Sequence, residues 1–132
     1  MQGLLYAFGA MRTVVGASSW LAPFAAGRLW GFGEVNADPH AAFTLRLFGA
    51  RDLVLGATLL VLPSVLSPKN RDTLRAVLMM GVVVDVLDVC AGVIGYQSLS
   101  NQSLLICVGG AAVFAAMGEI CLAQLPAAVK EN

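Results

Sequence analysis

The chain has 132 residues, of which 58% are hydrophobic and only 12% are charged, and its mean hydropathy is +0.80. Soluble domains carry about 25% charged residues, so this chain has too few charges to cover a soluble surface. Its eight acidic and eight basic residues cancel, which argues against nucleic acid as a partner because phosphate binding needs a basic surplus. The composition indicates an integral membrane protein whose main surroundings are the lipid bilayer.

Four apolar segments follow one another along the chain, each about 20 residues long, the length that a helix needs to cross the hydrocarbon core. We expect an all-α, integral membrane four-helix bundle forming one domain over residues 1–132, because a helix satisfies its own backbone in lipid. The first segment is expected to be retained, since Arg12 lies at its centre and a signal peptide carries its charge earlier. The predicted spans cover residues 4–23, 42–62, 77–96 and 104–125, the second ended by Pro63 and the fourth by Pro126.

The connections between the spans differ in charge. Residues 67–75 hold three bases and one acid and the tail adds Lys130, whereas residues 96–103 hold no charge. The positive-inside rule therefore predicts a multi-pass protein with both termini in the cytoplasm. The long connection, residues 24–41, is interpreted as an aromatic-anchored loop, with an interfacial cap over the bundle as the alternative.

The chain offers no pattern typical of a metal site. The single His40 is interpreted as a solvated loop residue, because no second histidine accompanies it. The three cysteines fall inside apolar runs without a C-x-x-C pair, so they are interpreted as small apolar fillers. We expect neither a metal nor a cofactor. The cysteines are Cys90, Cys107 and Cys121.

A segment of the first span is repeated in the second. FGAMRTVVGASSWLAP, beginning at Phe8, matches FGARDLVLGATLLVLP, beginning at Phe48, at seven of sixteen positions. Because consecutive spans run in opposite directions, the two copies form a partial inverted repeat, in which Arg12 aligns with Asp52. The small residues of the repeat are expected to mark a stripe where the two helices approach closely. These residues are Gly9, Gly16, Gly49 and Gly56.

Six ionisable residues are expected to lie at similar depth in the bilayer. A charge at the bilayer centre costs at least about 2.5–3.5 kcal/mol, so these residues should face inward, pair, or line a wet cavity. Asp85 and Asp88 share one helix face, whereas Arg51 and its neighbour on the chain point about 100° apart and should not reach the same spot. The two bases can neutralise only two of the four acids, so the other two acids must be protonated or hydrated. The six residues are Arg12, Arg51, Asp52, Asp85, Asp88 and Glu119.

The pattern F-G-A-R-D-x-x-x-G, beginning at Phe48 and followed by an acid-bearing third span, resembles a group of small four-span membrane proteins. These proteins are frequent in fungi, and many are recorded only as a domain of unknown function. Similar proteins occur in fungal polyketide and terpenoid pathways, where they are associated with opening or cyclising epoxides on lipophilic intermediates. The resemblance implies a related activity, but it assigns no catalytic residues.

We therefore expect a cofactor-free membrane enzyme that performs acid–base chemistry on a lipophilic small molecule, with epoxide hydrolysis or epoxide-opening cyclisation in secondary metabolism as the specific reaction. Asp52 and either Asp85 or Asp88 would be base and acid. Arg12 and Arg51 would tune them, and Glu119 would relay protons or support the site. The alternatives are a proton-coupled transporter acting as a homo-oligomer and a structural or assembly protein with an ion-paired core.

Overall fold

The computed structural model describes residues 2–32, 39–65 and 71–125, and within these ranges the fold is all helical, with no strand. The four long helices are α1 (Gln2–Leu21), α3 (Pro39–Val65), α4 (Arg71–Ile94) and a continuous helix over Asn101–Gln124. The last of these consists of α5 (Asn101–Ser103), a π-helical stretch η4 (Leu104–Val108) and α6 (Gly109–Gln124). The expectation of an all-α fold is confirmed.

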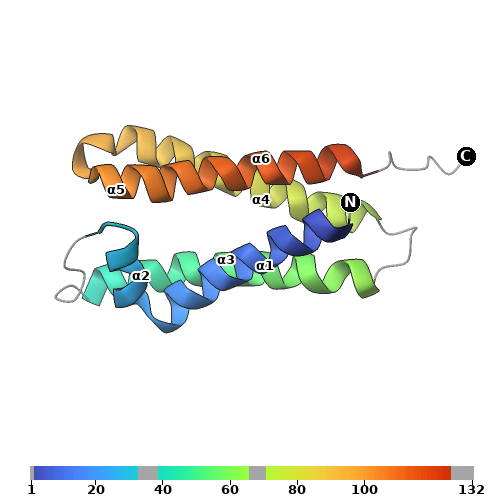
Figure 1. Cartoon of the computed structure of the whole chain (residues 1–132), viewed down its shortest axis with the longest axis horizontal. Helices are drawn as coiled ribbons and strands as arrows, with labels where there is room; N and C mark the ends of the chain where they lie inside the picture. The colour runs from blue at the N-terminus through green and yellow to red at the C-terminus, as the bar shows by residue number, and fades with distance from the viewer. Residues whose placement is uncertain (1, 33–38, 66–70, 126–132) are drawn as a thin grey trace, which may run out of the picture.

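The long helices are arranged as two antiparallel pairs (Figure 1). Helix α1 packs along α3, and α4 packs along α6. The start of α1 and the end of α6 lie at one end of the molecule, while α2 (Pro23–Leu29) and the short helix η3 (Tyr96–Ser98) lie at the other. The first two predicted spans therefore run in opposite directions, as the repeat requires.

Three predicted boundaries differ from the observed ones. Helix α3 continues through Pro63, which was expected to end it, because a proline in the last turn removes only one backbone hydrogen bond. Part of the connection predicted over residues 24–41 is helical, since Pro23 occupies the first turn of α2, where its fixed φ is favourable. Helix α4 begins at Arg71 rather than at residue 77. Lys69, Pro126 and Lys130 lie outside the described residues.

The glycines of the repeat form the contact between α1 and α3, which confirms the predicted small-residue stripe. A Cβ added at Gly56 would lie 2.5 Å from the backbone nitrogen of Thr13, and one at Gly49 would lie 2.7 Å from the carbonyl oxygen of Gly16. Gly9 likewise meets Gly56. At Gly49 and Gly56 a side chain would collide with the backbone of the other helix, so the two backbones approach directly.

A packed apolar core fills the end of the molecule where α1 begins. Its largest member is Phe8, which is 1% exposed. Cys121 belongs to this core, in agreement with its interpretation as an apolar filler. The buried members are Leu5, Phe8, Leu59, Leu74, Leu78, Cys121 and Leu125. This core leaves the opposite end of the bundle to the cavity described below.

Two helices of the described chain are long and apolar enough to cross a membrane. They are α4, with a mean hydropathy of 2.3, and the helix over Asn101–Gln124, with a mean hydropathy of 2.1. Helices α1 and α3 are not among these two, and charged residues lie inside all four long helices. The coarser expectation, membrane-type helices, thus has support from two of the four predicted spans.

Candidate functional site

Arg12 is the point at which all four long helices meet. Its side chain is fully buried, and Nη1 donates a 2.7 Å hydrogen bond to Oδ1 of Asp52 on α3. Nη2 donates to Oδ2 of Asp85 on α4. The rings of Phe8 on α1 and Phe114 on α6 each lie 4.9 Å from the guanidinium carbon and pack edge to face with each other. The cation is therefore held by two carboxylates and two aromatic rings.

Arg51 extends this arrangement toward the outside. Its two terminal nitrogens donate to both oxygens of Asp88, at 3.1 and 2.8 Å, in a bidentate pair. Its Nη2 also lies 3.6 Å from Oδ2 of Asp52. The expectation that Arg51 and Asp52 cannot reach the same spot is wrong, because the long arginine side chain compensates for the angle between the two positions. We call the five residues Arg12, Arg51, Asp52, Asp85 and Asp88 the charged cluster.

The charged cluster has a sealed half and an open half. The side chains of Arg12 and Asp85 are 0% and 3% exposed, whereas those of Arg51 and Asp88 are 29% and 30% exposed, with Asp52 between them at 12%. Two guanidinium groups face three carboxyl groups. One acid is therefore left over in the cluster, rather than the two expected from the sequence.

Glu119 is the one predicted site residue that the structure does not bring into the cluster. Its side chain lies on an exposed face of α6. Within the described part of the chain, no hydrogen bond or ion pair joins Glu119 to the cluster. Its depth in a bilayer stays a prediction, and the helix turns this position away from the centre.

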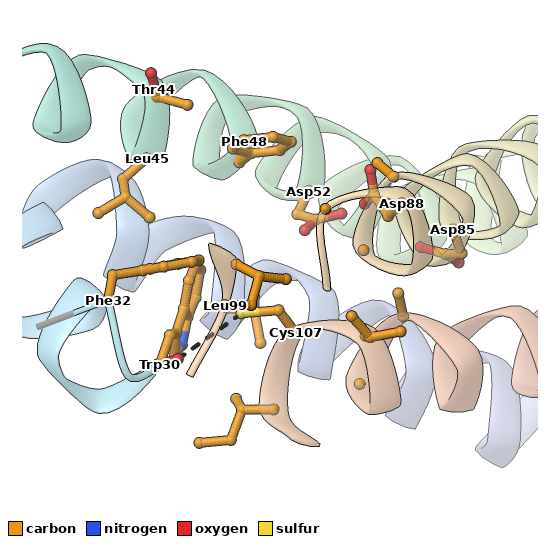
Figure 2. Close-up of a pocket in the computed structure, with 18 of the residues that line it drawn as sticks. Trp30, Phe32, Thr44, Leu45, Phe48, Asp52, Asp85, Asp88, Leu99 and Cys107 are labelled. Carbon is orange, nitrogen blue, oxygen red and sulfur yellow. Dashed lines mark hydrogen bonds between the residues drawn. The ribbon is translucent and has the colours of Figure 1, made fainter. Parts of the chain in front are cut away.

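A cavity of about 940 Å³ lies between the two helix pairs, on the side of the charged cluster away from the packed core. The carboxylates lie at one end and the rings of Trp30 and Phe32 at the other (Figure 2). The walls between them are mainly apolar. They include Leu45, Phe48, Leu99, Ile106, Val108 and Phe114. The volume is in the range of sites that bind small molecules.

The segment after α2 closes the far end of the cavity. The side chain of Ser100 donates a 2.9 Å hydrogen bond to the carbonyl of Gly31, and that of Gln102 donates one of 2.9 Å to the carbonyl of Leu29. Gly31 has a φ of +82° and only 2.8 Å between its added Cβ and Gln102, so glycine is required there. Residues 24–32 of this connection therefore cover one end of the bundle, as the cap alternative expected, and their place at a membrane interface stays a prediction.

Several cavity residues were not singled out in the sequence. His40, which was interpreted as a loop residue, lies in the first turn of α3 and lines the cavity together with Thr44 and Phe48. These three residues are four positions apart, and Arg51 follows three positions later. They therefore form one stripe of α3, which faces the cavity. That spacing can be recognised in the sequence. It places the cavity-lining residues of α3 on the same helix face as Arg51, which the sequence had already identified as a candidate site residue.

Comparison with known families places most of the chain in one of them. A family model described as "Domain of unknown function (DUF4267)" matches residues 9–121, a range that includes every member of the charged cluster. This agrees with the resemblance to a family recorded as a domain of unknown function, and it carries no activity with it. Comparison with curated proteins and with solved structures yielded no match.

Proposed function

The chain belongs to the family of the domain of unknown function DUF4267, and we propose that it is an integral membrane protein that binds a lipophilic small molecule in its cavity and acts on it through carboxyl groups. One observation carries this proposal. Four members of the charged cluster, including both residues of its open half, line an apolar cavity of about 940 Å³. Charges kept only for packing would not need such a cavity. These four are Arg51, Asp52, Asp85 and Asp88.

The outer surface supports a location inside a bilayer. Large apolar side chains are exposed on all four long helices, among them Val14, Val54, Leu87 and Leu105, which are between 61% and 77% exposed. A soluble bundle would present polar groups at these positions. The 20 residues of α1 span about 30 Å, the thickness of the hydrocarbon core. We therefore propose that α1 and α3 also cross the membrane.

The orientation proposed from the sequence fits the ends of the helices. The start of α1 and the end of α6 lie at the same end of the molecule (Figure 1). Arg71 and Arg75, in the first turns of α4, belong to this end as well. The positive-inside rule then assigns this end, with both termini, to the cytoplasm.

The charge imbalance supports acid–base chemistry. Three carboxyl groups with two guanidinium groups leave one carboxyl without a full counter-charge in a site bordered by apolar walls. Holding a proton there removes the unpaired charge, so the cluster can offer a carboxylic acid beside a carboxylate. Asp52 and Asp88 are the pair that we assign to this role, because both lie within 3.6 Å of Arg51 and both line the cavity.

Epoxide opening is the reaction we propose for this pair. The carboxylate removes a proton from water or from a hydroxyl group of the substrate, and the resulting oxygen attacks an epoxide carbon. The bond from that carbon to the epoxide oxygen breaks, and the carboxylic acid protonates the leaving oxygen. The carboxylate takes one proton and the carboxylic acid gives one, so the net reaction consumes only water. When the substrate supplies its own hydroxyl group, the net reaction consumes no second reactant. Arg51 holds both carboxyl groups in place.

The experiment uses purified protein in lipid nanodiscs and squalene epoxide as the probe. Mass spectrometry distinguishes hydrolysis, which adds one water, from cyclisation, which keeps the mass and changes retention. We expect Asp52→Asn and Asp88→Asn to abolish product. Asp72→Asn is the matched control, because Asp72 lies in the exposed first turn of the same helix as Asp88, away from the cavity. Equal turnover by wild type and Asp52→Asn would contradict the catalytic role.

Proton-coupled transport is the second candidate, and one observation favours it. The cavity lies on one side of the charged cluster while the packed core fills the other side, as expected for a transporter that faces one way. This candidate predicts flux of an unchanged substrate into proteoliposomes, driven by a pH gradient. Conversion of the probe without a pH-dependent flux would favour the enzyme.

A further inference from the structure

The cavity reaches the surface of the molecule between α3 and α4. Thr44 and Phe48 on α3 and Ala91 on α4 all line the cavity, and all three are exposed. They lie one or two turns from the open half of the charged cluster, Arg51 and Asp88. The residue that α4 contributes to this border, Ala91, has a small side chain. The opening is therefore bordered by Thr44, by Ala91 and by the ring of Phe48.

A second, smaller hollow meets the cavity at the same place. It has a volume of about 320 Å³ and is lined by four residues of α3, namely Thr44, Leu47, Phe48 and Arg51. Three of these also line the main cavity, while Leu47 is 57% exposed and lines the smaller hollow only. The side chains of Phe48 and Arg51 therefore stand between a hollow open to the outside and the interior of the cavity.

We propose that the ligand enters sideways from the lipid, between α3 and α4, and that Phe48 is the side chain that limits its entry. The proposal rests on the proposed function, because it assumes that the cavity takes a lipophilic molecule. On the outer face of α3 beside this opening, Phe43 and Leu47 are 60% and 57% exposed, next to the exposed Arg46. A molecule dissolved in lipid meets this face first.

The contacts of Phe48 allow its ring to move without disturbing the helix packing. The ring is 42% exposed, and the guanidinium carbon of Arg51 lies 5.2 Å from its centroid. Arg51 in turn is held by Asp88 on the opposite helix. The glycine contacts that join α3 to α1 involve Gly49 and Gly56 on another face of α3. An entering ligand would displace one aromatic ring and then meet the Arg51–Asp88 pair.

The other end of the cavity is a less suitable entrance for such a molecule. There the segment that carries Trp30 is attached to α5 by side-chain hydrogen bonds from Ser100 and Gln102. The side chain of Cys107 also approaches the carbonyl of Trp30, at 4.0 Å. Entry by this route would break several polar contacts, whereas entry past Phe48 breaks none of them. An experiment can separate the two routes by the solubility of the probe.

Cys107 provides a natural reporter inside the cavity, and Cys90 provides one outside it. Cys107 lines the cavity, whereas Cys90 is exposed on α4 and does not. The protein in nanodiscs is treated either with pyrene maleimide, which dissolves in lipid, or with a sulfonated maleimide confined to water. The extent of labelling at each cysteine is read by mass spectrometry over time. Labelling of Cys90 by pyrene maleimide serves as the internal control for the reagent.

We expect pyrene maleimide to label Cys107, with a rate that rises about tenfold in Phe48→Ala and falls about tenfold in Phe48→Trp. Phe43→Ala and Phe43→Trp are the matched controls, because Phe43 is exposed on the same helix and lines neither space. Rates at Cys107 that are independent of residue 48 would overturn the lateral entrance, as would faster labelling by the sulfonated reagent. No labelling of Cys107 by either reagent in any variant would instead refute the cavity, and with it the proposed function.

Discussion

Arg12 donates a 2.7 Å hydrogen bond to Asp52, the residue that occupies its own position in the second copy of the repeat, forty residues later. The glycines around them make crossed contacts, Gly9 with Gly56 and Gly16 with Gly49. Crossed contacts of this kind arise when two copies are related by a two-fold axis. A position that meets its own counterpart lies on that axis. Two like charges there would repel, so the difference between arginine and aspartate allows the two copies to pack.

Replacing Arg12 is expected to destabilise the fold severely. Arg12→Met keeps a similar length but leaves the carboxyl groups of Asp52 and Asp85 buried without their cation. Removing one partner of a buried ion pair costs about 3–5 kcal/mol. Thermal unfolding in detergent measures the effect, with Arg46→Met as the control because Arg46 is exposed on α3. Equal midpoints for the two variants would show that the cluster does not stabilise the bundle.

The glycine stripe predicts a clear difference between two kinds of alanine substitution. Gly56→Ala places a Cβ 2.5 Å from the backbone of Thr13, so α1 and α3 must separate. Overpacking of this kind costs about 1–3 kcal/mol. Gly109→Ala is the matched control, because nothing lies within 4 Å of its added Cβ. We expect Gly109→Ala to leave the unfolding midpoint unchanged or to raise it, since alanine favours the helix.

Asp88→Asn is expected to separate catalysis from folding. Asp88 belongs to the open half of the cluster, with a side chain that is 30% exposed. Loss of a general acid or base lowers turnover about 100-fold or more, whereas the unfolding midpoint should shift far less than in Arg12→Met. Turnover of squalene epoxide and thermal unfolding are measured on the same preparation. A large loss of stability with unchanged turnover would assign Asp88 a structural role.

Exchanging the charges of Arg51 and Asp88 tests the alternative that the protein is structural, with an ion-paired core. The double variant Arg51→Asp with Asp88→Arg keeps opposite charges facing each other across α3 and α4. If pairing alone matters, the double variant should recover the function lost in each single variant. We expect it to recover expression and folding but no turnover, because the carboxyl group then lies directly before Asp52 on α3, where a short side chain points about 100° away from it, instead of on α4. Full recovery of turnover would support an ion-paired scaffold.

The helical character of the chain could be predicted from its sequence, and so could the contact between its first two long helices. Runs of about 20 apolar residues allow few alternatives in lipid, and glycines seven residues apart lie on one helix face whatever surrounds them. The sequence also aligned Arg12 with Asp52, and the structure shows that these two equivalent residues are in contact. The helical character depends on each segment alone, and the contact depends only on the two segments that repeat each other.

Only the tertiary structure decided which charges meet and what space they border. Position along a helix follows from the rise per residue, which is why Glu119 was expected in the cluster. Rotation about the helix axis depends on the neighbouring helices, and it turns Glu119 outward. The pairing of Arg51 with Asp88 depends in the same way on how the two helix pairs face each other. The cavity arises because these pairs separate toward one end, where Trp30 and Phe32 cover it. A space between four helices is a property of their packing, which no single segment of the sequence encodes.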